Sequence, residues 1–205
     1  MIHDLRRLSL AAILGAGALA LGACGSSSHS SSSTATGSTS SAVAASAPVA
    51  VVGKSTTVTL NPATVQLLSQ NGITITAVAP AKATKVLVFP VTGGHISVTT
   101  FAGSIEQSGG ITLAHGGRSV QLTNFVLNTE SKQITAVVGG MRVPIFDLNL
   151  AAIRRASGPN GTLLASDIKL VVTEEAASSL DGLLGVTGLK AGQDFGVATI
   201  TLAIK

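Results

Sequence analysis

Short apolar runs separated by glycine-rich breaks dominate residues 86–150. The breaks are Gly-Gly pairs, a Ser-Gly-Gly triplet and Asn- or Ser-containing segments. Short apolar runs bounded by turn residues are typical of strands. Paired glycines adopt positive φ without steric cost, so the chain can reverse between strands. The pattern predicts successive antiparallel strands joined by tight turns.

Two helix signals frame this β-rich segment. Asn61 and Pro62 follow a strand-like alternation and supply an N-cap and a first helical residue, which predicts a helix over residues 62–70. Thr173 caps a second helix, which we expect over residues 174–184. The apolar face of this second helix is expected to consist of Leu180, Leu183 and Leu184. Both helices follow a strand and end at a glycine, which is either a weak internal repeat or a coincidence.

The predicted fold class is mainly β, with two short helices. Short strands at regular spacing with glycine-rich turns favour layered sheets over βαβ units. We therefore expect an antiparallel β-sandwich or open barrel of roughly nine to eleven strands. A single domain over residues 48–205 lies within the usual size range.

The N-terminus carries the pattern of a lipoprotein signal peptide. Arg6 and Arg7 precede an apolar run over residues 8–21, and Leu-Gly-Ala then leads into Cys24. The run has about 14 residues, whereas a transmembrane helix needs roughly 17–25. We expect residues 1–23 to be cleaved and Cys24 to be acylated, with palmitate among its acyl chains; the alternative is an ordinary signal peptide. Cys24 is the only cysteine, so no disulfide can form within the chain.

Residues 24–47 are expected to form a tether between the lipidated cysteine and the domain. The segment is rich in Ser, Thr, Ala and Gly and carries no charge, so it lacks the apolar surface needed to offset the entropy of ordering. Its root-mean-square reach is about 25–30 Å. These features predict an extracytoplasmic protein on the outer face of the cell membrane, with the membrane as a partner through the anchor.

Composition narrows the function classes. Without residues 1–23 the chain has 11 Lys and Arg and 8 Asp and Glu, a formal charge of +3, and it has no Trp or Tyr. Nucleic-acid binders usually cluster basic residues with stacking aromatics, so we exclude that class. No nucleophile elbow or phosphate loop is present, and no zinc-like ligand spacing. We expect neither an enzyme nor a metal site.

Three residues remain as candidate ligand contacts. His95 follows a Gly-Gly pair and His115 precedes one, so both are expected at turns, where glycines leave space for a flat ligand. Met141 offers a thioether after Gly139 and Gly140. The alternative for each is an ordinary surface side chain.

A series of short motifs runs through roughly residues 86–202. They are Phe-Pro-Val-Thr at 89–92, Gly-Ser-Ile at 103–105, Ser-Gly-Gly-Ile at 108–111, His-Gly-Gly at 115–117, Leu-Thr-Asn at 122–124, alternating positions in 134–138 and 143–150, Val-Thr-Glu at 172–174 and Ala-Gly at 191–192. Together these segments resemble the HtaA-type domain, a family of secreted or surface-anchored haem-binding β-rich modules of Gram-positive bacteria.

The resemblance implies a haem site to which His115 contributes, with haem as a possible cofactor. The family's iron ligand is a tyrosine in an aromatic-rich N-terminal segment. This chain contains no tyrosine, and its corresponding residues 56–78 contain no aromatic side chain or histidine. Any bound iron could take only His or Met ligands, and Phe89, Phe101 and Phe125 are the candidate walls.

Three functions stay open on this basis. The first is a lipid-anchored module that binds haem or another flat apolar ligand near His115. The second is a structural or protein-interaction lipoprotein of the envelope with no small-molecule ligand. The third is an apolar lipid carrier with a cavity between sheet layers. The identity of any protein partner does not follow from the sequence.

Overall fold

The computed structural model describes residues 47–205. The predicted signal peptide, Cys24 and nearly all of the tether lie outside the described residues. Within them the chain forms twelve strands and two helices. Their bounds are β1 (Val49–Leu60), α1 (Pro62–Gln70), β2 (Thr74–Val78), β3 (Lys82–Ala83), β4 (Leu87–Ile96), β5 (Gly103–Gln107), β6 (Gly110–His115), β7 (Arg118–Asn128), β8 (Gln133–Val138), β9 (Met141–Asn149), β10 (Arg154–Gly158), β11 (Thr162–Val172), α2 (Glu174–Leu184) and β12 (Asp194–Ile204).

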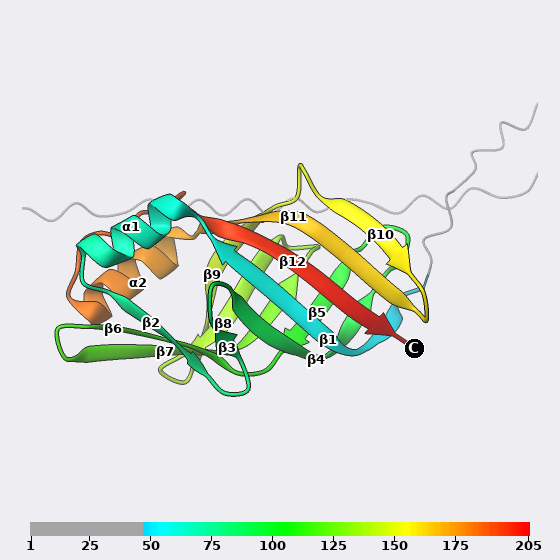
Figure 1. Cartoon of the computed structure of the whole chain (residues 1–205), viewed down its shortest axis with the longest axis horizontal. Helices are drawn as coiled ribbons and strands as arrows, with labels where there is room; N and C mark the ends of the chain where they lie inside the picture. The colour runs from blue at the N-terminus through cyan, green and yellow to red at the C-terminus, as the bar shows by residue number, and fades with distance from the viewer. Residues whose placement is uncertain (1–46) are drawn as a thin grey trace, which may run out of the picture. The chain divides into compact units, whose positions relative to one another are not determined.

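Eight of the strands form an antiparallel barrel. Neighbouring strands pair in the order β7-β5-β4-β1-β12-β11-β9-β8, and the pairing of β8 with β7 completes the ring. β6 extends the sheet beyond β7, and β2 pairs with β6 (Figure 1). The predicted fold class is confirmed. The strand count exceeds the prediction because β3 has two exposed residues and β10 is exposed throughout, so neither shows a burial pattern.

Both helices have the predicted bounds, and their caps explain why. The Ala63 N–H donates to Asn61 Oδ1 at 3.0 Å, and the Ala176 N–H donates to Thr173 Oγ1 at 3.1 Å. A left-handed Gly185 ends α2. α1 and α2 lie at one end of the barrel, and β10 and the C-terminus lie at the other (Figure 1). Among residues 47–205 no helix is long and apolar enough to span a membrane.

The paired glycines act as turns at two sites and as a strand contact at a third. Gly116-Gly117 and Gly139-Gly140 have positive φ and join β6 to β7 and β8 to β9, as predicted. Gly93-Gly94 instead lies inside β4, so the turn expected before His95 is wrong. A Cβ on Gly94 would lie 2.1 Å from the Ser104 carbonyl oxygen, so glycine there permits close strand pairing at a bulge.

Candidate functional site

The barrel interior is filled by its own side chains. The rings of Phe89 and Phe125 meet edge to face with centroids 5.1 Å apart, and those of Phe146 and Phe195 are 4.6 Å apart. A cavity inside the barrel has a volume of only about 20 Å³, and another, between the two helices and the sheet, has about 30 Å³. A cavity of this size holds about one water molecule. The interior therefore has no room for haem or an acyl chain in this conformation.

One polar pair lies among these apolar side chains. The Gln107 side-chain amide donates to Thr56 Oγ1 at 3.0 Å, and both residues are buried. Both line the smaller cavity. The bond joins β5 to β1 over the inner face of β4, which lies between them, and it satisfies a donor that would be costly to bury alone. We assign it a structural role.

One surface hollow lies outside the barrel, beside α2. This hollow, which we call the α2 groove, has a volume of about 390 Å³, within the range of ligand sites in proteins. The residues that line it come from β7, β8, the turn between β8 and β9, and α2. They are Ser119, Val120, Gln121, Thr123, Val137, Val138, Gly139, Gly140 and Leu183. These side chains are apolar or neutral polar, so the groove suits an uncharged, partly apolar ligand.

Two residues of the β6–β7 hairpin hold the end of α2 that forms one wall of the groove. The His115 Nδ1 lies 3.1 Å from the Leu184 carbonyl oxygen. The Arg118 guanidinium packs over Gly185, where an added Cβ would come within 2.8 Å of Nη1. A cation at a helix C-terminus is also favoured by the helix dipole. The hairpin thereby fixes the last turn of α2, and with it Leu183.

His115 is half-buried and occupied by this contact. A neutral imidazole that donates from Nδ1 to the carbonyl keeps a lone pair on Nε2. A Cβ on Gly72 would lie 3.6 Å from the His115 Cδ2, so the ring packs beside the end of α1. The His115 ring thus lies between the ends of the two helices.

The three predicted ligand contacts do not converge. Met141 is 71% exposed at the start of β9, directly after the turn that lines the α2 groove. His95 is exposed in β4, where it pairs with Ala50 and Ser104 on a different part of the barrel. None of the three lines the α2 groove. Residues 47–205 contain no group of three or more His, Cys, Asp or Glu side chains that could hold a metal ion.

The predicted phenylalanine walls lie elsewhere. Phe89 and Phe125 point into the barrel, where they line the smaller internal cavity. Phe101 is buried in the loop between β4 and β5 and not on a strand. These candidates do not form a wall beside His115, because strand alternation directs Phe89 and Phe125 into the core.

Only one wall of the groove can be anticipated from the sequence. The apolar face expected for α2 includes Leu183 together with Leu180 and Leu184. The structure buries Leu180 and Leu184, whereas Leu183 is 49% exposed and lines the groove. A leucine beside the buried face of a short helix was the available signal. The groove residues of β7 and β8 give no such signal, because buried valines that alternate with neutral polar side chains are ordinary in a strand.

The fold can be compared with known proteins. A scan against protein-family models finds no match, and a search of curated proteins finds none. Among solved structures, the crystal structure of the C-terminal domain of HtaA from Corynebacterium glutamicum is similar, with a TM-score of 0.57 and 15% sequence identity. The likeness covers 77% of this chain and 99% of that chain. The chain thus has an HtaA-like fold.

Proposed function

We propose that this protein is a lipid-anchored protein of the cell envelope whose HtaA-like barrel binds an uncharged, partly apolar segment of a partner protein in the α2 groove. The observation that carries the proposal is the contrast between a filled interior and an open outer groove. Internal cavities of about 20 and 30 Å³ leave no site inside, whereas the groove offers about 390 Å³.

The lining supports a peptide as the ligand. Val137 and Leu183 supply accessible apolar contacts, while Gln121 and hydroxyl side chains supply hydrogen-bonding groups. Such a mixture suits an extended chain, whose backbone needs polar partners and whose side chains need apolar ones. The anchor supports an envelope location, since the sequence before residue 24 matches a lipoprotein signal.

The residues present do not fit haem in the way the family resemblance implies. Haem requires an axial ligand and an apolar wall. His115 is half-buried, and its Nδ1 already contacts the Leu184 carbonyl, so it offers one nitrogen to a ligand. The chain has no tyrosine. Its phenylalanine rings lie in the core or at the other end of the barrel. A lipid carrier is not supported either, because the interior cavities are water-sized.

Site-specific photo-crosslinking tests the proposal. A photoreactive amino acid at Gln121, which lines the groove, should give a discrete adduct on intact cells. The same amino acid at Lys169, an exposed strand position that does not line the groove, is the matched control. Adducts of equal yield at both positions, or at neither, would contradict the proposal.

Haem binding is the second candidate, because the fold is HtaA-like and His115 stands where the family has its histidine. Haem titration of the wild-type protein and of His115→Ala, followed in the Soret region, separates the two candidates. Tight binding that His115→Ala abolishes would favour haem. Equal weak binding in both proteins, or none, leaves the groove proposal.

A further inference from the structure

The end of the barrel away from the helices is where the described chain begins. Val49 at the start of β1 pairs with Ile96, which precedes the β4–β5 loop. The Lys205 backbone N–H donates to the Ala50 carbonyl, so the end of β12 lies there too. We call this region the β10 rim. It comprises β10, the β4–β5 loop, the turn between β7 and β8, and the adjoining halves of β1 (residues 49–54), β11 (residues 162–167) and β12 (residues 199–204) with Lys205.

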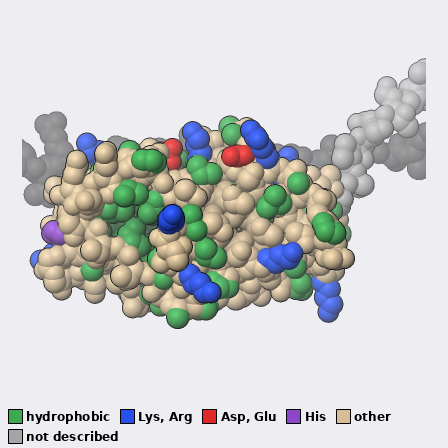
Figure 2. All heavy atoms as spheres, in the orientation of Figure 1, with side chains coloured by type: hydrophobic (Ala, Val, Ile, Leu, Met, Phe, Trp, Pro, Cys, Tyr) green, Lys and Arg blue, Asp and Glu red, His purple; other side chains and the backbone are tan. Residues whose placement is uncertain are grey.

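The β10 rim carries the whole positive excess of the described residues. Its basic residues outnumber its acidic ones by three, and the remaining six basic residues of the described chain are matched by six acidic ones. Figure 2 shows Lys and Arg side chains spread over one face, some of them toward this end. The charged residues of the rim are Lys54, Lys132, Arg154, Arg155 and Lys205, with Glu130 and Asp167.

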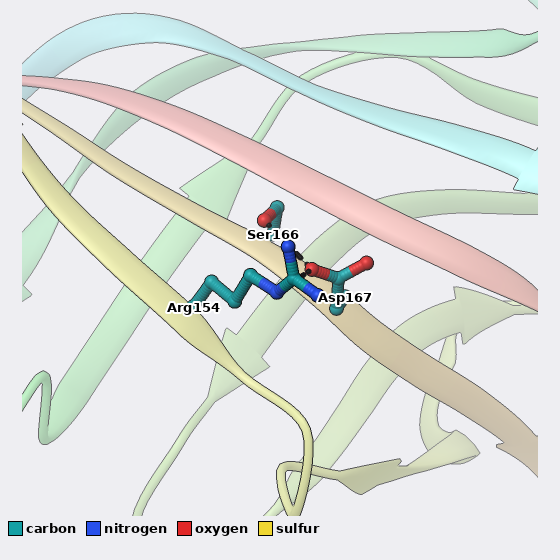
Figure 3. A network of polar contacts seen from close by, with 3 residues as sticks. All are labelled: Arg154, Ser166 and Asp167. Atoms are coloured by element: carbon teal, nitrogen blue, oxygen red, sulfur yellow. Dashed lines mark hydrogen bonds and ion pairs between the residues drawn. The ribbon is translucent and has the colours of Figure 1, made fainter.

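Internal contacts hold several of these cations at the surface. Arg154 Nε lies 3.2 Å from Asp167 Oδ2, which also accepts from Ser166 Oγ at 3.1 Å (Figure 3). The Arg154 side chain is still 84% exposed. Lys54 Nζ donates to Thr162 Oγ1 at 2.8 Å, which ties β1 to the start of β11. Each of these groups keeps further donors available to an anion.

Apolar side chains lie between the cations. Val98 is 42% exposed and Leu164 is 38% exposed, and both line a hollow of about 90 Å³ together with Arg155. A second hollow of about 260 Å³ also includes Arg155 and is lined further by Leu150 and Ile153. Arg155 Nη1 donates to the Thr100 carbonyl at 2.8 Å, which holds the guanidinium beside both hollows.

We propose that the β10 rim docks on the anionic phospholipid surface of the membrane to which the chain is anchored. This inference rests on the lipid anchor of the proposed function. Each Lys or Arg near an anionic bilayer raises affinity roughly fivefold, and exposed apolar side chains among them enter the headgroup boundary. These contacts are weak alone. A tether with a reach of about 25–30 Å raises the effective concentration of the membrane to the millimolar range.

The single cysteine provides a direct test. The chain from residue 24 onward is coupled through Cys24 to a maleimide lipid in vesicles of phosphatidylglycerol and phosphatidylcholine, or of phosphatidylcholine alone. Hydrogen–deuterium exchange of residues 97–102 and 154–164 should slow severalfold on the anionic vesicles only. Exchange at the β6–β7 turn, at the opposite end, should stay unchanged. Equal exchange on both vesicles, or protection at the helix end instead, would overturn the proposal.

Two triple variants of equal net charge distinguish docking through the β10 rim from a general effect of net charge. The triple variant Lys54→Gln, Arg155→Gln and Lys205→Gln should lose the protection. A control with the same net charge, Lys82→Gln, Lys85→Gln and Lys190→Gln, should keep it. Equal loss of protection in both variants would show an effect of net charge and would overturn the proposal. Thermal melting confirms that each variant is folded. Because the coupling is chemical, the result does not depend on acylation in cells, so failure of the anchor would be detected separately by membrane fractionation.

Discussion

His115 on the β6–β7 hairpin contacts the carbonyl oxygen of Leu184, 69 residues later, through Nδ1 at 3.1 Å. This bond joins a sheet extension to the last turn of α2, and Leu183 in that turn forms a wall of the α2 groove. The histidine that the family resemblance connects with haem therefore positions a helix in this chain. Its effect on the proposed ligand site is indirect.

Replacing His115 with Ala should lower the free energy of unfolding by about 1 kcal/mol, because one hydrogen bond of a half-buried group is lost. Urea denaturation measures the change. His95→Ala is the control, since His95 is exposed, and it should change stability by less than about 0.5 kcal/mol. If both variants lose the same free energy of unfolding, the contact between His115 and Leu184 does not stabilise the fold.

Gln107 and Thr56, which share a buried hydrogen bond, should be energetically coupled in their effects on stability. Thr56→Val removes the acceptor and leaves the Gln107 amide buried without its partner, at a cost of about 1–3 kcal/mol. Adding Gln107→Leu to Thr56→Val should recover part of this loss. A double-mutant cycle should give a coupling energy of about 1 kcal/mol. Strictly additive effects would mean that the two side chains do not depend on each other.

Two glycines with positive φ should differ sharply in their tolerance of alanine. Gly94→Ala would place a Cβ 2.1 Å from a carbonyl oxygen of β5, so we expect a loss of about 3 kcal/mol or more. Gly117 has nothing within 4 Å of the added Cβ, and its loss should be about 1 kcal/mol, from backbone strain alone. Thermal melting of the two variants ranks them, and a reversed order would show that β4 and β5 approach differently.

Cys24→Ala should move the protein out of the membrane fraction. Lipoprotein processing adds at least two acyl chains, and each buried CH₂ contributes about 0.8 kcal/mol to membrane binding. Cell fractionation followed by immunoblotting makes the comparison, with the wild-type protein in parallel. Unchanged membrane association of the variant would refute the anchor.

Local signals predicted the parts of the fold that local chemistry controls. Asn61 and Thr173 marked the starts of both helices, because a cap acts within a few residues of its own position. Gly93-Gly94 does not form the predicted turn, because Gly94 is required by a close approach to the Ser104 carbonyl on a different strand. The sequence carries no sign of a contact made across the sheet.

Most of the candidate site cannot be predicted from the sequence, because the site depends on contacts between residues that are distant along the chain. The α2 groove combines β7, β8 and α2, and its shape depends on the bond between His115 and Leu184. The family resemblance correctly indicated an HtaA-like fold. It could not place the phenylalanine side chains, because packing across the barrel determines which of them reach the core.

The most direct test of the central claim is the yield of the photo-crosslink from Gln121 when the groove wall is changed. Leu183→Asp places a charge in the groove, whereas Val65→Asp places one on α1 outside it, and both side chains are 49% exposed. We expect Leu183→Asp to reduce the yield at least about fivefold, as expected for an interface residue worth more than 1 kcal/mol, and Val65→Asp to leave it unchanged. An undiminished yield in Leu183→Asp, with both variants folded, would contradict binding in the α2 groove.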